Sequence, residues 1–300
     1  MRFLLLALAA VTAEEVGFRT ISFFVGDAAK PDPRRCTKLG QGVCDTRGEF
    51  HSQFQQDRLV KTVIFTDAEQ RPRFFIDLAA NHPIYKSNTR ALERDAGWQG
   101  LCVDGNEEFL MLLVKRRRCQ VVGAIVTSAT NDRVRFRRWL GAGNVGGQTG
   151  QWQHGLSGVV GYDNKEQQGQ HAQMKASGGV TTRDFEGLTV KFSTLLETHN
   201  APKEIGFLSL DVEGAEDAVL GDAFPWDQYT FLAMTIERPQ PSLRKRLRAH
   251  GYHRVCTMAE DMIYVHKSFP GGVAAVVERV RAAAPKFVAM SNVTHDVSFS

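Results

Sequence analysis

The sequence lacks the features that would assign it to a special class of protein. Its 300 residues carry a net charge of only +4, and its N-terminal apolar stretch, the candidate for a membrane anchor, is well short of the ~20 residues that cross a bilayer. The composition is ordinary, with 43% hydrophobic and 23% charged residues, which excludes a wholly disordered or collagen-like chain. We therefore expect a folded protein, built as one large α/β domain or as a domain with added segments.

Motifs for common cofactors and metals are missing or misplaced. The five cysteines do not have the spacing of a zinc site, and there is no P-loop lysine motif. Residues 141–146 match the dinucleotide fingerprint G-x-G-x-x-G. However, they follow the charged segment "RVRFRRWL" rather than an apolar strand, and "GQTGQWQHG" after them does not predict a helix. We therefore do not expect a dinucleotide site there.

The N-terminus has the pattern of a secretory signal peptide. Arg2 precedes an apolar stretch from Phe3 to Val11, and the small residue Ala13 is the expected cleavage site. This predicts the secretory pathway (ER or Golgi lumen, or secretion), with the cytoplasm as the location if the signal is not real. The glycosylation sequon at Asn292 has a meaning only in that pathway.

The cysteines fit an oxidising compartment only loosely. Cys36 and Cys44 lie in a polar segment rich in proline and glycine, and whether they pair is left open. Cys102, Cys119 and Cys256 fall within apolar runs of strand length. We expect these three to be small buried hydrophobic side chains.

From Arg73 onward, short apolar runs alternate with helical patterns. The runs are "RFFID", "GLCVD", "CQVVGAIVT", "GFLSLDVE" and "TFLAMTIE". The helical patterns include "NTRALERDA", which Ser87 can cap and Gly97 ends, "EEFLMLLVKRR", "AEDAVLGDAF" and "PSLRKRLRAHG". This alternation predicts a doubly wound, mostly parallel sheet covered by helices on both faces.

The end of the chain breaks this alternation. "YHRVCTM" and "MIYVHK" are separated by three residues, too few for a helical crossover, so they predict an antiparallel hairpin. The expected organisation is a signal peptide at 1–13, an irregular lead-in at 14–51, the main α/β domain at 52–268 with a glycine-rich insertion at 141–179, and a helical tail at 269–300.

Several apolar runs end in an acidic residue. Asp77, Asp104, Asp211 with Glu213, and Glu237 each follow or close a predicted strand. A single such acid is usually a helix cap. Because ligands of open α/β sheets bind beyond the carboxyl ends of the strands, the whole set predicts one acidic site.

The positions of the acids favour a nucleoside cofactor. Asp104 ends the second strand, where an acid characteristically accepts hydrogen bonds from ribose hydroxyls. After the first strand the chain has Ala79-Ala80-Asn81, without the glycines that a pyrophosphate needs. S-adenosylmethionine has no pyrophosphate and carries a positive sulfonium, so it suits an acidic site of this kind.

Six segments, in this order, resemble the FkbM-type S-adenosylmethionine-dependent methyltransferases over residues 52–265. They are "SQFQQD", "FFIDLAANHPIYKSNTRALERDAGWQGLCVDGNEEF", "FLSLDVEGAED", "MTIERP", a "GY" helix end and "DMIYVH". The resemblance implies a Rossmann-like class I methyltransferase fold. It also implies O-methylation, typically of a hydroxyl group on a sugar, glycan or other small molecule.

The resemblance also implies roles for individual residues. The residues expected beside the methionine part of the cofactor are Asp77, Ala79, Ala80 and Asn81; those on the ribose and adenine side are Asp104 and Asn106; those flanking the adenine are Thr127 and Ser128. The chain departs from the family pattern at Ala79, where glycine is usual, and at residues 104–107, where "DGNE" replaces the common Glu-Pro-Asn-Pro.

An alcohol needs a base before it attacks a methyl group, and the acids at 211–213 and 237 supply candidates. Asp211 and Glu213 are the expected base or acceptor-orienting residues, and Glu237 lines the acceptor pocket or pairs with a nearby basic residue. These carboxylates could instead hold a divalent metal that acidifies the hydroxyl, but two acids without a histidine are a thin ligand set, so no metal is the expectation. His82 is a further candidate base, although such a lone histidine is more often a cap.

Two other functions are open. The basic runs at 115–118, 133–138 and 244–248 would serve an RNA-modifying methyltransferase, although the small charge excess makes nucleic acid a less favoured partner. The fold could also serve a non-catalytic secreted binding module. The acceptor and the oligomeric state do not follow from the sequence.

Overall fold

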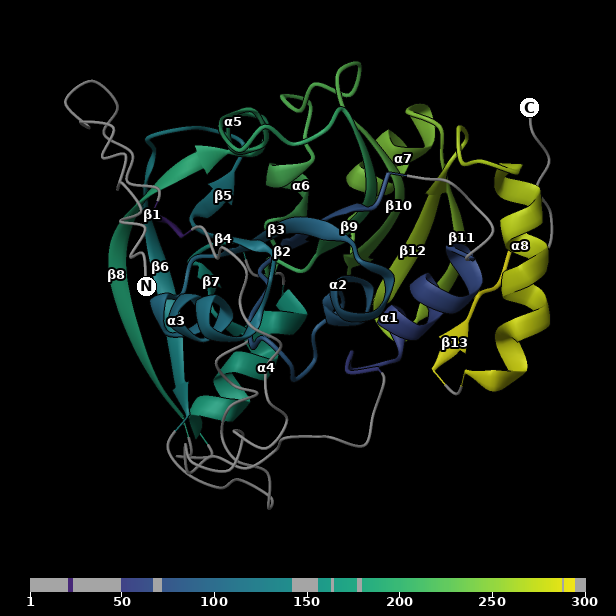
Figure 1. Cartoon of the computed structure of the whole chain (residues 1–300). Coiled ribbons are helices and arrows are strands. Elements are labelled where there is room, and N and C mark those ends of the chain that lie inside the picture. The colour runs from purple at the N-terminus through teal and green to yellow at the C-terminus, as the bar shows by residue number, and fades with distance from the viewer. Residues whose placement is uncertain are drawn as a thin grey trace, which may run out of the picture.

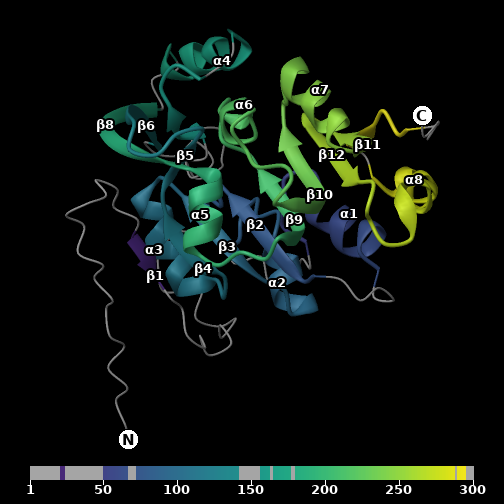
Figure 2. The same ribbon diagram turned by 90° about the horizontal axis from the view of Figure 1, so that it is seen from above.

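The structure is a computed structural model that describes residues 21–23, 50–66, 72–141, 156–162, 165–176, 180–287 and 289–294. A large central sheet runs through the molecule, with helices packed on it and a smaller sheet beside one end (Figures 1 and 2). The predicted signal peptide, most of the lead-in, Cys36 and Cys44 lie outside the described residues, as does the G-x-G-x-x-G match after its first glycine.

The large sheet is mixed, with a parallel centre. Its strand order is β1-β4-β3-β2-β9-β10-β12-β11-β13. Strands β4, β3, β2, β9 and β10 run parallel, whereas β12 and β11 pair antiparallel, as the short link between them predicts. The strands are β1 (Ile21–Phe23), β2 (Phe74–Leu78), β3 (Gln99–Asp104), β4 (Gln120–Gly123), β9 (Glu204–Leu210), β10 (Thr230–Glu237), β11 (Tyr252–Met258), β12 (Asp261–His266) and β13 (Met290–Ser291).

Helices cover both faces of this sheet. Neighbouring strand residues such as Phe75 and Ile76 enter different hydrophobic clusters, because side chains alternate between the two faces of a strand. This explains why the central strands are apolar almost throughout. One face packs on α1 (Gln56–Leu59), the π-helix η2 (Val60–Ile64), α2 (Arg90–Ala96), α3 (Glu107–Arg116) and α8 (Gly272–Ala283), the other on α5 (Phe192–Thr198), α6 (Glu216–Val219) and α7 (Pro241–Ala249).

Local signals set the helix boundaries near the site. Gly97 ends α2 with a φ of 67°, a left-handed conformation that glycine adopts without steric cost. The side chain of Asn106 accepts the backbone N–H of Glu108 and caps α3. The N-cap of α2 is Thr89 rather than Ser87, but the Ser87 hydroxyl still accepts the backbone N–H of Arg90.

A second, four-stranded sheet has the order β5-β8-β6-β7. It contains β5 (Ile125–Thr127), β6 (Arg133–Gly141), β7 (Gly158–Val159) and β8 (Val180–Lys191), and α4 (Lys165–Ala176) lies between the last two in sequence. The prediction of one strand over 119–127 is therefore wrong, since this run is divided between the two sheets. The 141–179 segment is also not wholly irregular, because it includes β7 and α4.

The signal for β6 is present in the sequence. Arg133 and Arg135 are exposed, while Phe136 and Arg138 are buried. Such alternation is typical of a half-buried strand. The arginines of the exposed face made this segment look like a charged run, so the strand is missing from the sequence-based prediction.

The C-terminal tail packs against the large sheet through α8. Four valines of this helix are buried in the cluster on one face of the sheet: Val273, Val276, Val277 and Val280. Among the described helices, none has the length and apolarity needed to cross a membrane.

Cys102 and Cys119 form a disulfide, so the prediction that they are simply buried hydrophobic side chains is wrong. Cys102 lies in β3 and Cys119 immediately precedes β4, the parallel neighbour of β3, so that their Cα atoms are 5.9 Å apart. The helical crossover through α3 brings the two cysteines together, which their separation in sequence does not reveal. Cys256 is buried and free, as predicted.

Candidate functional site

A cleft opens at the carboxyl ends of the parallel strands, where the sequence predicts the ligand. It contains about 520 Å³ of empty space, part of it open to solvent. Its walls are mainly apolar, with Asp104 and Asn81 among the few polar residues, as in most small-molecule sites. The lining residues are Leu78, Ala79, Asn81, Val103, Asp104, Gly105, Phe109, Ala124, Ile125, Val126, Phe136, Ser157, Gly158, Val159, Val212 and Ala215.

Asp104 is the acidic residue of this cleft. Its carboxylate accepts the backbone N–H groups of Asn81 at 2.8 Å and Asn106 at 2.7 Å. Burial nevertheless raises the pKa of Asp104 to about 6, because removal from water disfavours its charge more than these hydrogen bonds favour it. A buried carboxylate with remaining acceptor sites is suited to bind ligand hydroxyl groups.

The turn after β2 brings backbone close to the cleft. Ala79 and Asn81 line the cleft and have positive φ values of 63° and 54°. Alanine pays a steric cost in this conformation, which explains why glycine would fit position 79 well. Ala80, between them, is buried and donates its N–H to Val103, so it contacts the sheet rather than the cleft.

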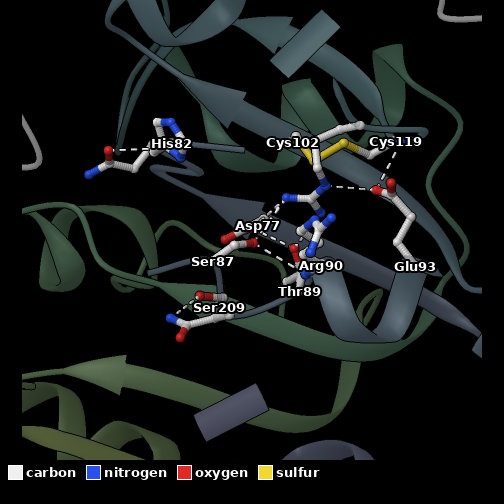
Figure 3. A network of polar contacts seen from close by, with 12 residues as sticks. Asp77, His82, Ser87, Thr89, Arg90, Glu93, Cys102, Cys119 and Ser209 are labelled. Carbon is white, nitrogen blue, oxygen red and sulfur yellow. Dashed lines mark hydrogen bonds and ion pairs between the residues drawn. A yellow bond between two sulfur atoms is a disulfide. The ribbon is translucent and has the colours of Figure 1, made fainter. Parts of the chain in front are cut away.

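Asp77 lies beneath the cleft and is occupied by protein partners. It is 3% exposed, accepts the hydroxyl of Thr89 at 2.5 Å and lies 3.9 Å from the guanidinium of Arg117. Figure 3 shows Asp77 turned toward Thr89 and Ser87. Burial raises the pKa of Asp77, against the opposing effect of Arg117. Direct contact of Asp77 with the cofactor therefore stays a prediction, and the structure assigns it a supporting position.

Of the residues expected around the ribose and adenine, Asp104 lines the cleft, whereas the others do not. Asn106 is fully buried as the cap of α3, and its amide Nδ2 has no partner among the described residues. Thr127 is buried within β5 and Ser128 is exposed, and neither lines the cleft. The adenine contact of these residues stays a prediction, whereas their neighbours Ile125 and Val126 do line the cleft.

Sequence reasoning missed the wall that the second sheet contributes. Phe136 of β6, Val159 of β7 and Ile125 of β5 form a small hydrophobic cluster that lines the cleft. A Cβ atom added to Gly105 would lie 3.0 Å from the ring of Phe136, so a larger residue fits here only if that ring shifts. Recognition of β6 as a strand would have drawn attention to Phe136.

Three acids that the sequence singles out do meet, beside the cleft. Carboxylate oxygens of Asp211, Glu213 and Glu237 lie within 4.8 Å of one another. The parallel pairing of β9 and β10 aligns Leu210 with Ile236, which brings the next residues, Asp211 and Glu237, side by side. Val212 lines the cleft, so this carboxylate cluster adjoins it.

The carboxylate cluster holds more protons than free carboxyl groups would. Burial, followed by the neighbouring charges of Asp211 and Glu213, raises the pKa of Glu237 to about 12. Burial also raises the pKa of Asp211, although a hydrogen bond with Glu237 and the charge of Lys86 oppose this effect. Asp211 Oδ1 and Glu237 Oε2 are buried and have no hydrogen-bond partner among the described residues. The two raised pKa values favour one proton shared by this pair, with Glu237 the more strongly protonated group.

Glu213 completes the cluster from a strained position. Its φ is 55°, and its carboxylate accepts the amide of Gln167 at 3.1 Å. Burial and the charges of Asp211 and Glu216 raise its pKa well above the ordinary value. The strain of a buried acid in a left-handed conformation favours a functional role for this position.

The carboxylate cluster has the spacing of a divalent-cation site, since carboxylate oxygens are hard ligands. The expectation of no metal stays a prediction. Two cationic side chains already offset part of the negative charge: Arg238 lies 3.1 Å from Glu237, and Lys86 lowers the pKa of Asp211.

His82 has the geometry of a cap rather than of a base. Its Nδ1 accepts the backbone N–H groups of Ile84 at 3.2 Å and Tyr85 at 2.8 Å. Burial lowers the pKa of His82 to about 4, with help from Arg116 and Arg90, so the ring is neutral near pH 7. The hydrogen bonds hold the loop after β2, and the capping interpretation of His82 is the one that the geometry favours.

A cleft at the carboxyl ends of parallel strands, with carboxylates beside it, lies where open α/β sheets bind their ligands. A sequence model of the methyltransferase FkbM domain matches residues 77–254, more than half of the chain. The chain therefore belongs to the FkbM methyltransferase family. No curated protein and no solved structure matches it.

Proposed function

We propose that this protein is an S-adenosylmethionine-dependent O-methyltransferase with a Rossmann-like class I fold. Its acceptor is a hydroxyl group of a sugar, glycan or other small molecule. The observation that carries the proposal is that the carboxylate cluster of Asp211, Glu213 and Glu237 lies directly beside the cleft that Asp104 lines. One site then binds a nucleoside cofactor and the other an alcohol.

The cleft suits S-adenosylmethionine in shape and chemistry. Asp104 would accept the ribose hydroxyls, and the apolar wall of Ile125, Val126 and Phe136 would pack against the adenine. The backbone at Ala79 would lie beside the methionine part. The bound cofactor would supply an electrophilic methyl group for in-line displacement.

Asp211 is the best candidate for the base. An alcohol attacks only when its proton is removed, and a carboxylate with a raised pKa accepts that proton more readily than an ordinary one. Glu237, protonated near pH 7, donates to Asp211 and holds it in place. Glu213, the third member of the carboxylate cluster, would orient the acceptor.

We also propose that the protein acts in the secretory pathway. The disulfide between Cys102 and Cys119 supports this, because disulfides persist in oxidising compartments and are rare in the cytosol. The signal-peptide pattern at residues 1–13 supports the same location.

The RNA-modifying alternative gains no support from the basic run at 133–138. Arg133 pairs with Glu186, and Arg137 makes a two-pronged hydrogen bond with Asp184. Opposite charges on β8 therefore neutralise much of the basic face of β6. The binding-module alternative is less favoured, since the carboxylate cluster remains complete.

Incubation of the purified protein with methyl-labelled S-adenosylmethionine and a panel of glycans, small alcohols, lipids and RNA tests the proposal. We expect label to enter a hydroxyl of a glycan or small molecule. Calorimetry should give a cofactor affinity that Asp104→Ala weakens. Asp211→Ala should keep that affinity and lose transfer, whereas Asp222→Ala, at an exposed carboxylate, should change neither. Equal cofactor affinity in Asp104→Ala and the unmodified protein would refute the site.

A further inference from the structure

A buried polar network lies under the turn that lines the cofactor cleft. At its centre is Arg117, whose side chain is fully buried although it is charged. Its Nε donates to Glu93 at 2.9 Å, and its two terminal nitrogens donate to Ser87 at 3.0 Å and Thr89 at 2.8 Å. A buried charge is costly unless it is paired and hydrogen-bonded, so loss of any one of these partners should disturb the position of Arg117.

The partners of Arg117 belong to the segment that shapes the site. Residues 79–89, called the 79–89 segment below, connect β2 to α2. Ser87 and Thr89 lie at the end of this segment. Its beginning, Ala79 and Asn81, lines the cofactor cleft, and Lys86 acts on the carboxylate cluster through its charge. The Thr89 hydroxyl in turn donates a hydrogen bond to Asp77, near the end of β2. Arg117 thus holds the end of the 79–89 segment directly and lies 3.9 Å from Asp77, two residues before its beginning.

The disulfide fixes the position from which Arg117 acts. Arg117 is two residues before Cys119, and Cys102 is two residues before Asp104 on β3. Asp77 is the register partner of Cys102 in the parallel pair β2–β3. Glu93 accepts the backbone N–H groups of Arg118 and Cys119, so α2 holds the same short connection. Figure 3 shows the disulfide, Glu93, Thr89 and Asp77 gathered at one place.

We propose that Thr89 and Arg117 are positioning residues for the cofactor, and that the disulfide Cys102–Cys119 holds Arg117 in register with the 79–89 segment. Neither residue lines the cleft, so both act through Asp77, Ala79 and Asn81. The inference rests on the proposed cofactor. It adds residues to which the family pattern assigned no role.

The expected consequence is that loss of the network affects cofactor binding rather than the chemical step. Thr89→Val removes the hydroxyl that joins Asp77 to Arg117 while keeping the shape of the side chain. We expect the KM for the cofactor to rise about tenfold, as for the loss of one charged hydrogen bond, with kcat nearly unchanged. Thr89→Ser, which keeps the hydroxyl, should restore the affinity.

Thr257→Val is the matched control. Thr257 is also a buried threonine, at 6% exposed, but its hydroxyl has no partner among the described residues, and it lies in β11. Cofactor binding should not change in this variant. Reduction by a dithiol should weaken cofactor binding in the same way; in this reaction the protein disulfide takes up two electrons and two protons to give two thiols, and the dithiol is oxidised to its own disulfide. The Cys102→Ala/Cys119→Ala variant should bind weakly with or without the dithiol, and Cys256→Ser should behave like the unmodified protein.

Amide hydrogen exchange of the ligand-free protein separates this inference from the proposed function. Thr89→Val should accelerate exchange in the 79–89 segment, while Thr257→Val should not. This result supports the positioning role whichever cofactor is bound. Unchanged exchange and unchanged cofactor affinity in Thr89→Val would overturn the inference, even if the unmodified protein transfers methyl groups as proposed.

Discussion

Glu216 offers a sharp test of the electrostatics at the site. It is 3% exposed at the start of α6, and one of its oxygens accepts the N–H groups of Val212 and Gly214 at 3.1 and 3.3 Å. Burial raises its pKa from 4.5 to about 7, with a further contribution from the charge of Asp211. At about 1.4 kcal/mol per pH unit, this difference corresponds to about 3 kcal/mol of stability.

The sign follows from proton binding. Because the pKa of Glu216 is higher in the folded than in the unfolded protein, the folded state binds more protons between about pH 4.5 and pH 7. The contribution to stability is thus complete below pH 4.5 and is lost as the pH rises through 7. Glu216→Gln keeps the acceptor oxygen and removes the charge.

We expect Glu216→Gln to increase the free energy of unfolding by about 1–3 kcal/mol at pH 8 and to change it little at pH 4. The upper end applies only if the new amide group finds partners. Urea denaturation at both pH values and equal ionic strength measures the effect. Glu278→Gln, at a carboxylate that is 68% exposed, is the control and should show no such pH dependence. Equal destabilisation of Glu216→Gln at both pH values would refute the reasoning.

Three further changes test other parts of the structure. Ala79→Gly should raise the free energy of unfolding by about 0.5–1 kcal/mol, because glycine adopts the positive φ of this position without steric cost. Ala80→Gly, at the adjacent buried alanine, should lower the free energy of unfolding, and denaturant titration measures both variants. Gly105→Ala should push Phe136 into the cleft and weaken cofactor binding in calorimetry, an effect absent if the cofactor lies elsewhere. Phe207→Ala, which is fully buried, should lower the free energy of unfolding by about 3–5 kcal/mol, and a loss below 1 kcal/mol would contradict the core assignment.

Much of the fold follows from local patterns in the chain. The apolar runs that became β2, β3, β9 and β10 are continuous because each is buried on both faces, and this pattern also predicts the helices between them. The short link at 259–261 left an antiparallel hairpin as the only connection of β11 to β12. The Asp211–Glu213 and Glu237 pairing could be expected because parallel strands end at one edge.

Other features depend on contacts between distant segments. The Cys102–Cys119 disulfide forms because a helical crossover places two neighbouring strands in register, and no spacing rule in the sequence indicates it. Likewise, the sequence does not show that Asp77 contacts Thr89 and Arg117, and its direct contact with the cofactor stays a prediction. In the sequence, Arg117 is only one member of the basic run at 115–118, and its burial arises from tertiary contacts.

The sequence by itself determined the α/β architecture, the edge at which the acids gather and the membership of a methyltransferase family, since these follow from short-range periodicity and motif order. Only the tertiary structure decided which acids face the cleft, which share a proton and which are neutralised in the interior. The reason is that burial and the exact distance between charges set the pKa and the partner of each carboxylate, and both arise only when segments far apart in the chain pack together.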